Sequence, residues 1–316
     1  MAESAMSAKK SGSIGLFGAV ALIVLGGLIV YGVQLAMASG AAVRGASAAS
    51  PGSQGLAEAV SKDDPERVRG AIKAGADVNA AMLSDKPGRE GMTPLMHASM
   101  DGKPDTMRAL VEAKAKLDQR TDDGRTALMY AAGWGDAAKV KLLLDAGAQS
   151  SARASDGWTA LMWAAARGEP ASVKALTAAG ADVNAANKWR QTALMAAARI
   201  GSVEKVAMLL EAGASATATD INGETALSIA AQNEAPAGVL QALVKAGAPI
   251  DGGDADSVTP LMKAAERGDA DQVATLLALG ADPSKKDKPN GWTAKDWASK
   301  RDDDKGRAVV KAIEAR

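Results

Sequence analysis

The sequence has no cysteine, one histidine and few aromatic residues, with six Trp, two Tyr and one Phe among 316 residues. Without cysteine there is neither a disulfide nor a thiolate metal ligand, and His97 has no second histidine to join it in a catalytic or metal site. Neither sign of charge is in excess, because 37 Lys and Arg residues balance 37 Asp and Glu residues. Phosphate backbones attract basic surfaces. We therefore predict a protein that is not an enzyme, has no cofactor or metal, and does not bind nucleic acid.

One acidic segment superficially resembles a calcium-binding loop. Asp251, Asp254 and Asp256 lie among glycines, but Ala265 occupies the twelfth position counted from Asp254, where such a loop needs a bidentate glutamate. We therefore interpret this segment as a solvated turn, and we expect His97 to be a packing or surface residue.

The chain contains an internal repeat. A Thr-Ala-Leu or Thr-Pro-Leu step recurs every 33 or 34 residues, and a diverged copy follows it. The threonines of this step are Thr93, Thr126, Thr159, Thr192, Thr225, Thr259 and the diverged Thr293. Threonine can accept a backbone hydrogen bond that starts a helix, and a period of this size is typical of stacked helical units. We number the units one to seven by these threonines.

Each unit predicts a helical hairpin. An alanine-rich segment follows the threonine, and a second segment carries large apolar residues at helical spacing, such as Val140, Leu143 and Leu144. Glycines such as Gly147 then allow the left-handed backbone that ends a helix, whereas Lys114 in the same place predicts a weaker helix end. A methionine three residues after most of the threonines indicates packing between helices.

The unit resembles the ankyrin repeat in its turn, its Thr-Pro-Leu helix start, its second helix and its closing Gly-Ala. This resemblance implies an all-α solenoid of helix-turn-helix units joined by β-turn fingers. We expect the array to occupy residues 56–316, with an N-terminal cap at 56–81 and a C-terminal cap at 290–316, where charged residues replace the repeat pattern. From Gly75, which closes the N-terminal cap, to Lys114 in unit one the interval is 39 residues, six more than the period, so we expect a projecting finger within residues 82–91.

The N-terminal segment is apolar. Residues 14–37 carry no formal charge, and as a helix they would be roughly 36 Å long, against a hydrocarbon core of about 30 Å. Lys9 and Lys10 precede this run and only Arg44 follows closely, which favours a cytoplasmic tail at 1–13 and export of the rest. We predict a transmembrane anchor at 14–37 and a flexible linker at 38–55. The alternative is a signal peptide cleaved after Ala38.

In the ankyrin family, partners usually dock on the concave side, and the matching positions here gather Trp and Arg in units two to four. These residue types are enriched at interface hot spots. The predicted contact residues are Arg125, Trp134, Trp158, Arg167, Lys188, Trp189, Arg190, Gln191 and Arg199. For Trp134, Trp158 and Trp189 packing within the array is the alternative. Packing is what we expect for Tyr130, Trp163 and Trp297, four residues after their threonines.

Arg190 and Ser257 stand where the other fingers have glycine, two residues before the threonine. Glycine there indicates a positive φ, and a side chain costs on the order of 1 kcal/mol. Resemblance to alanine-rich bacterial arrays with Thr-Ala-Leu-Met starts, together with the apolar N-terminal segment, implies a scaffold in a bacterial inner membrane, with its repeats in the periplasm, binding a partner protein. The alternative function is a periplasmic accessory factor that binds a small cofactor or assists an exported redox enzyme.

Overall fold

The computed structural model describes residues 51–82 and 91–315. Over these residues the protein consists of helices joined by turns, with two isolated β-bridges and no strand. The predicted all-α solenoid is therefore confirmed for the described part of the chain. The tail at 1–13, the anchor at 14–37, most of the linker at 38–55 and most of the finger within 82–91 lie outside the described residues.

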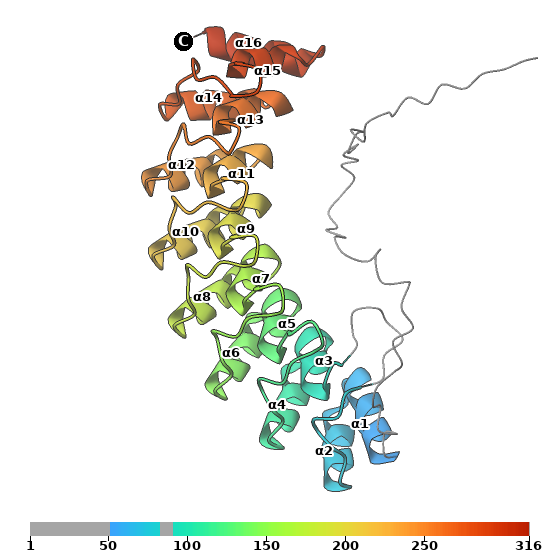
Figure 1. Ribbon diagram of the computed structural model, residues 1–316. Helices are drawn as coiled ribbons and strands as arrows, with labels where there is room; N and C mark the ends of the chain where they lie inside the picture. The colour runs from blue at the N-terminus through green and yellow to red at the C-terminus, as the bar shows by residue number, and fades with distance from the viewer. Residues whose placement is uncertain (1–50, 83–90, 316) are drawn as a thin grey trace, which may run out of the picture. The chain divides into compact units, whose positions relative to one another are not determined.

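Sixteen helices form the described array, two to each hairpin (Figure 1). They are α1 Pro51–Ser61, α2 Pro65–Lys73, α3 Pro94–Asp101, α4 Pro104–Glu112, α5 Ala127–Trp134, α6 Ala137–Asp145, α7 Ala160–Ala166, α8 Pro170–Ala178, α9 Ala193–Ile200, α10 Val203–Glu211, α11 Ala226–Gln232, α12 Ala237–Lys245, α13 Pro260–Arg267, α14 Ala270–Ala278, α15 Ala294–Ser299 and α16 Asp304–Glu314. Helix α1 begins at Pro51, inside the segment that we expected to be linker, because proline is well placed in a first helical turn. None of these helices is both long enough and apolar enough to cross a membrane.

The repeated threonines fix where each odd-numbered helix starts. The side chain of Thr159 accepts a hydrogen bond from the Met162 N–H, and five of the other six repeat threonines cap their helices in the same way. Thr126 is the exception and makes no such bond. The even-numbered helices start either with a capping side chain such as Asp136 or with a proline such as Pro170. Each hairpin is therefore set by short local signals.

Hairpins stack in chain order, odd-numbered helices against odd-numbered ones and even against even (Figure 1). Leu128, Leu161 and Leu194 are buried at equivalent places in successive odd-numbered helices. The alanines of these helices let the units approach closely. At Gly168, between α7 and α8, a Cβ atom would lie 2.1 Å from the Ala132 carbonyl oxygen of the preceding unit.

The fingers between hairpins are tight turns joined to one another. We use "finger" for the residues just before each threonine, such as 187–191. The Ser155 N–H donates to the Asp123 carbonyl at 2.8 Å, and the Ile221 N–H donates to the Trp189 carbonyl at 3.1 Å. Equivalent bonds link the other fingers from unit two to unit seven. The fingers are therefore a ladder that stays in register with the helices.

Among the described residues five side chains have a positive φ, at Asp63, Lys114, Arg190, Glu234 and Ser257, and three of them stand where the sequence led us to expect glycine. As predicted, Arg190 and Ser257 have positive φ values of 59° and 61°. Lys114 has a φ of 62° and still closes its helix, because the hydrogen bond from its N–H to the Val111 carbonyl is kept. All three side chains are held in a conformation that L-residues avoid.

Candidate functional site

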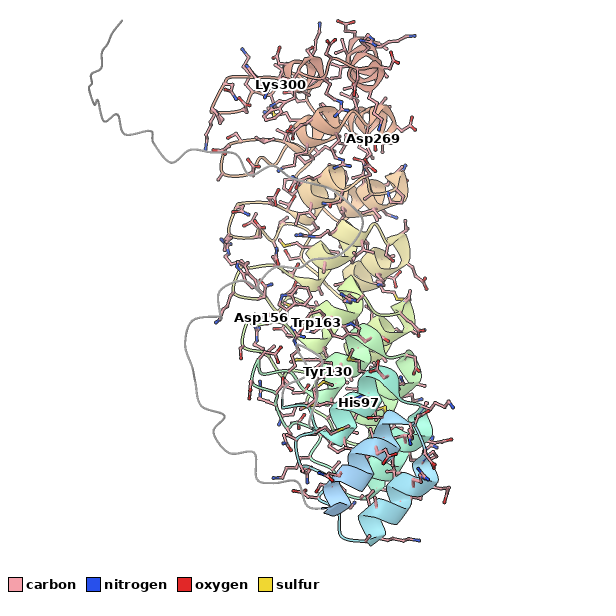
Figure 2. All side chains as sticks on the ribbon, turned by 90° about the vertical axis from the view of Figure 1, so that its right-hand side faces the viewer. His97, Tyr130, Asp156, Trp163, Asp269 and Lys300 are labelled. Carbon is pink, nitrogen blue, oxygen red and sulfur yellow. The ribbon has the colours of Figure 1, made fainter. Side chains whose placement is uncertain are left out.

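The predicted contact residues lie on two parts of units two to four. Arg125, Trp158 and residues 188–191 belong to the fingers, whereas Trp134, Arg167 and Arg199 lie at the C-terminal ends of α5, α7 and α9. We call the surface made by the fingers and by the exposed sides of the odd-numbered helices the finger face. In the odd-numbered helices behind the fingers, His97, Tyr130 and Trp163 follow one another from unit to unit (Figure 2).

Four aromatic side chains form a cluster on units two and three. The ring centroid of Trp163 lies 4.7 Å from that of Trp134 and 4.6 Å from that of Trp158. Tyr130 is buried beside Trp134, with 5.9 Å between ring centroids. Burial, together with the nearby Asp123 carboxylate, raises the pKa of the Tyr130 hydroxyl. Trp134 and Trp158 are half-buried against the core, so much of their surface is already used within the chain.

Two guanidinium groups lie over this cluster. The Arg125 Cζ atom is 4.9 Å from the Trp163 ring centroid and 6.0 Å from that of Trp134. Arg167 lies over the Trp134 ring at 4.9 Å. Arg125 also forms an ion pair with Asp123 at 2.9 Å, whereas the indole Nε1 of Trp163 is buried without a hydrogen-bond partner among the described residues. Cation–π contacts of this kind stabilise a partly buried cluster by about 0.5–2 kcal/mol each.

The exposed apolar side chains lie further along, on units four and five. Among the described residues, the exposed large hydrophobic side chains are Trp189, Ile200, Val203 and Ile221, with exposed fractions of 44%, 57%, 43% and 55%. Trp189 and Ile221 are on neighbouring fingers joined by a backbone hydrogen bond, and Ile200 and Val203 flank the turn between α9 and α10. Of these four, our site prediction named only Trp189.

Two of the missed residues carried a usable signal. Ile200 stands eight residues after Thr192, as Trp134 and Arg167 do after their own threonines, and Ile221 stands four before Thr225, as Lys188 does before Thr192. Val203 opens α10 and belongs to neither register. Gln191, which we did predict, accepts a hydrogen bond from the side chain of Asn187 at 3.1 Å. It therefore supports the shape of its finger.

Unpaired cations gather around the exposed apolar residues. Within the described chain no ion pair forms at Arg167, Lys188, Arg190 or Arg199. Arg190 donates one hydrogen bond from Nη2 to the Thr219 hydroxyl at 3.2 Å, which leaves its other N–H groups available. Unit four therefore combines uncompensated positive charge with exposed apolar surface.

Unit six presents the opposite case, a buried and compensated cation. Lys263 is 6% exposed, and its Nζ lies 2.7 Å from Glu224 Oε1 and 3.1 Å from Asp254 Oδ2. Burial by itself would lower the pKa of the Lys263 ammonium, but the two carboxylates outweigh it and the pKa is raised. Asp254, considered above for a calcium loop, is thus part of an ion triad between fingers and α13.

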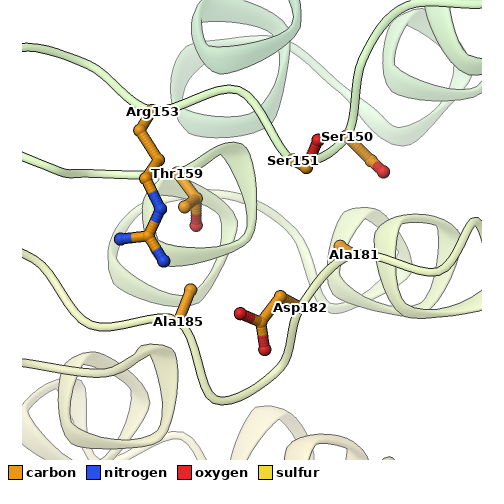
Figure 3. A pocket seen from close by; sticks show the side chains of 7 residues that line it. All are labelled: Ser150, Ser151, Arg153, Thr159, Ala181, Asp182 and Ala185. Carbon is orange, nitrogen blue, oxygen red and sulfur yellow. The ribbon is translucent and has the colours of Figure 1, made fainter.

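Enclosed space is limited in the described part of the chain. One cavity of about 70 Å³ lies behind the fingers of units three and four, where Arg153, Thr159 and Asp182 are among its lining residues (Figure 3). The guanidinium of Arg153 donates to the Ala186 carbonyl at 2.7 Å. Another cavity, near Gln54 and Met82, measures about 140 Å³. Both cavities are smaller than the sites that bind drug-sized ligands, which typically measure about 300–1,000 Å³. Among the described residues, no group of three or more acidic or histidine residues could hold a metal ion.

Comparison with protein families settles the class of the array. The family model for ankyrin repeats matches residues 56–154, 140–220, 161–251 and 216–287. The chain belongs to the ankyrin-repeat family. The ankyrin repeat domain of human ASB11 has the same fold, with a TM-score of 0.63 and 23% identity over 70% of this chain and 98% of that domain.

Two curated relatives share a shorter ankyrin segment. This chain is 51% identical over 43 residues to an IkB-like protein of African swine fever virus strain Badajoz 1971 Vero-adapted, and 49% identical over 43 residues to that of isolate Warthog/Namibia/Wart80/1980. These segments cover 14% of the ankyrin chain and 18% of each viral protein. The chain thus spans less than a fifth of the length of these relatives.

Proposed function

We propose that the ankyrin array binds a partner protein through the finger face of units two to four and performs no catalysis itself. The observation that carries this proposal is the pair of exposed side chains at the two ends of α9, Trp189 and Ile200, together with four cations that form no ion pair. Large aromatic residues and arginines concentrate binding energy at interfaces. Contiguous exposed apolar surface on a soluble domain also marks interaction sites.

The backbone under Trp189 is held before any partner arrives. The Trp189 N–H donates to Asn187 Oδ1 at 2.9 Å, and its carbonyl accepts from the Ile221 N–H at 3.1 Å. Because binding then orders little more than side chains, less conformational entropy is lost on association. The finger of unit four is therefore a preformed part of an interface.

The test is co-purification after crosslinking in cells, using the full chain and a double variant, Trp189→Ala with Ile200→Ala. Loss of a hot-spot residue typically costs at least about 2 kcal/mol, so we expect captured partner to fall roughly thirtyfold. Lys174→Ala on the exposed side of α8 is the matched control and should capture as much partner as the wild type. Unchanged capture by a folded double variant would contradict the proposal.

We also propose that residues 14–37 anchor the array in a bacterial inner membrane, with the repeats in the periplasm. The support is the uncharged length of this segment and the Lys9 and Lys10 pair before it. Fractionation and protease protection of spheroplasts test this placement, and N-terminal sequencing distinguishes an anchor from cleavage after Ala38. Recovery of the protein in the cytoplasm would refute the proposal.

A further inference from the structure

Resting on the proposed finger-face interaction, we infer the chemistry of the partner. We propose that the partner presents an extended acidic segment with a large apolar side chain, and that this segment crosses α9 between the finger of unit four and the C-terminal ends of α7 and α9. The proposal stands on three observations: the charge balance of the finger face, the strained backbone at Arg190, and the exposed apolar residues of units four and five.

Arg167, Lys188, Arg190 and Arg199 on this part of the finger face form no ion pair within the described residues. Several cations elsewhere have carboxylate partners: Arg125 pairs with Asp123, Lys263 with Glu224 and Asp254, Arg267 with Glu234, and Arg301 with Asp303. In unit seven, Lys288 instead donates to the Ala255 carbonyl and Lys300 lies over the Trp292 ring. Two carboxylates in neighbouring fingers bind backbone N–H groups of their own fingers and form no ion pair with these cations. Asp156 accepts the N–H of Trp158 at 3.0 Å, and Asp220 accepts those of Asn222 and Glu224. Arg167, Lys188, Arg190 and Arg199 therefore attract carboxylates from outside the array.

Arg190 carries the strongest indication. Its φ of 59° is the value that glycine supplies in five other fingers, at Gly91, Gly124, Gly157, Gly223 and Gly291. A side chain at this position strains the finger, and the described contacts give the guanidinium only one hydrogen bond, to Thr219. Its planar fork of donors matches a carboxylate in bidentate geometry. Arg190 therefore has further N–H donors available, which the carboxylate of an acidic residue in the partner would accept.

The exposed apolar residues of units four and five indicate that the partner segment also carries a large apolar side chain. Trp189 and Ile221 expose their side chains at the fingers, and Ile200 exposes its side chain at the far end of α9. Ala196, four residues after Thr192, is the smallest residue in the row that holds Tyr130 and Trp163 in the preceding units. A segment crossing α9 therefore passes over an alanine where those units present aromatic rings.

Helix length sets the spacing of the acidic residues. Helix α9 has 8 residues and is about 12 Å long, with cations at its finger end and at its C-terminal end. An extended chain covers this distance in about four residues. The expected segment therefore carries acidic residues about four positions apart, with a bulky apolar residue between them.

The experiment is a selection of short random peptides displayed on phage against the full-length protein in detergent. We expect enrichment of peptides with this acidic and apolar pattern. The synthetic winner, labelled for fluorescence anisotropy, should bind about tenfold more weakly to Arg190→Gly and to Arg199→Glu. Arg190→Gly removes the cation while relieving the strained φ, so its melting temperature should not fall, and weaker binding by this variant cannot be ascribed to unfolding.

Other outcomes separate this inference from the proposed function. Enriched peptides that are neutral or basic, but lose binding with Trp189→Ala, overturn the acidic segment and leave the finger-face interaction standing. Peptides that bind Trp189→Ala as tightly as the wild type overturn both. A selection without enrichment overturns the acidic segment, as does tighter binding of poly-dT than of any selected peptide.

Discussion

At the scale of single residues, two buried lysines show how partners decide the effect of burial. Lys205 and Lys263 are each 6% exposed. The Nζ of Lys205 donates to the Ala165 carbonyl at 3.2 Å, and burial lowers the pKa of this ammonium group. Lys263 faces two carboxylates, and its pKa is raised despite burial. The surroundings of Lys205 therefore disfavour its charged ammonium, whereas the two carboxylates beside Lys263 favour the charged form.

This contrast predicts opposite outcomes for the same substitution. Lys263→Met leaves Glu224 and Asp254 together without their cation, so the free energy of unfolding should fall by about 3 kcal/mol. Lys205→Met removes a poorly solvated charge and should change stability by less than about 1 kcal/mol. Urea denaturation at neutral pH checks both. Equal losses in the two variants would show that the carboxylate partners do not matter.

The pH dependence gives a second measurement. Because the pKa of Lys263 is raised in the folded state, its contribution to stability is complete below the unfolded pKa of about 10.4 and is lost as the pH rises through the folded pKa. The difference in unfolding free energy between wild type and Lys263→Met should therefore shrink at alkaline pH. A difference that stays constant would exclude the ion triad as its cause.

At the scale of helical hairpins, the turn between α7 and α8 is the place least tolerant of a side chain. A Cβ atom at Gly168 would lie 2.1 Å from the Ala132 carbonyl oxygen and 3.0 Å from the Ala164 Cα atom, both of them backbone. Neither neighbour can move without displacing a helix. The glycine is therefore required by the approach of unit three to unit two, and its φ is not in the positive range that favours glycine.

We predict that Gly168→Ala lowers the unfolding free energy by about 2–3 kcal/mol, because two packed units must separate to admit the methyl group. Gly70→Ala is the matched control, since it adds the same methyl group inside α2 with no atom within 4 Å. That variant should be more stable than wild type by about 0.5–1 kcal/mol. Chemical denaturation measures both, and a neutral Gly168→Ala would contradict the close approach.

At the scale of the whole array, stability should be a sum over units and their interfaces. Deleting residues 193–225 joins Thr192 to Ala226 and keeps a Thr-Ala-Leu step at the junction. We predict a folded protein with lower unfolding free energy and a smaller denaturant m-value, because less surface is buried. Circular dichroism during urea unfolding tests this. Loss of helical signal before denaturant is added would show that the units are not interchangeable.

Local signals account for what the sequence could predict. Each unit repeats a threonine equivalent to Thr159, an alanine-rich helix and apolar positions equivalent to Leu143. The repeat period, the helix starts and the buried positions could therefore be predicted from the spacing of these residues. The ion triad could not be predicted, because Glu224 and Lys263 are 39 residues apart and only stacking brings them together. For the same reason we predicted that Arg125 contacts a partner, although its guanidinium lies over the Trp163 ring of the next unit.

The exposed site was only partly predictable. Trp189 was found through its register, and the missing glycine at Arg190 pointed to the same finger. Exposure itself depends on neighbouring units, and Ile200 differs from the more covered Trp134 only through what packs beside it. Sequence position therefore indicates which residues line the finger face, whereas the stack decides how much of each is free.

The ladder of finger hydrogen bonds always joins the same two positions of the repeat, from the Ser155–Asp123 bond to the Ala255–Asn222 bond. A unit cut at these positions and joined to another keeps both the donor and the acceptor of this bond. Gene duplication can therefore lengthen such a protein by whole periods, and selection can alter the residues that meet a partner without rebuilding the support beneath them.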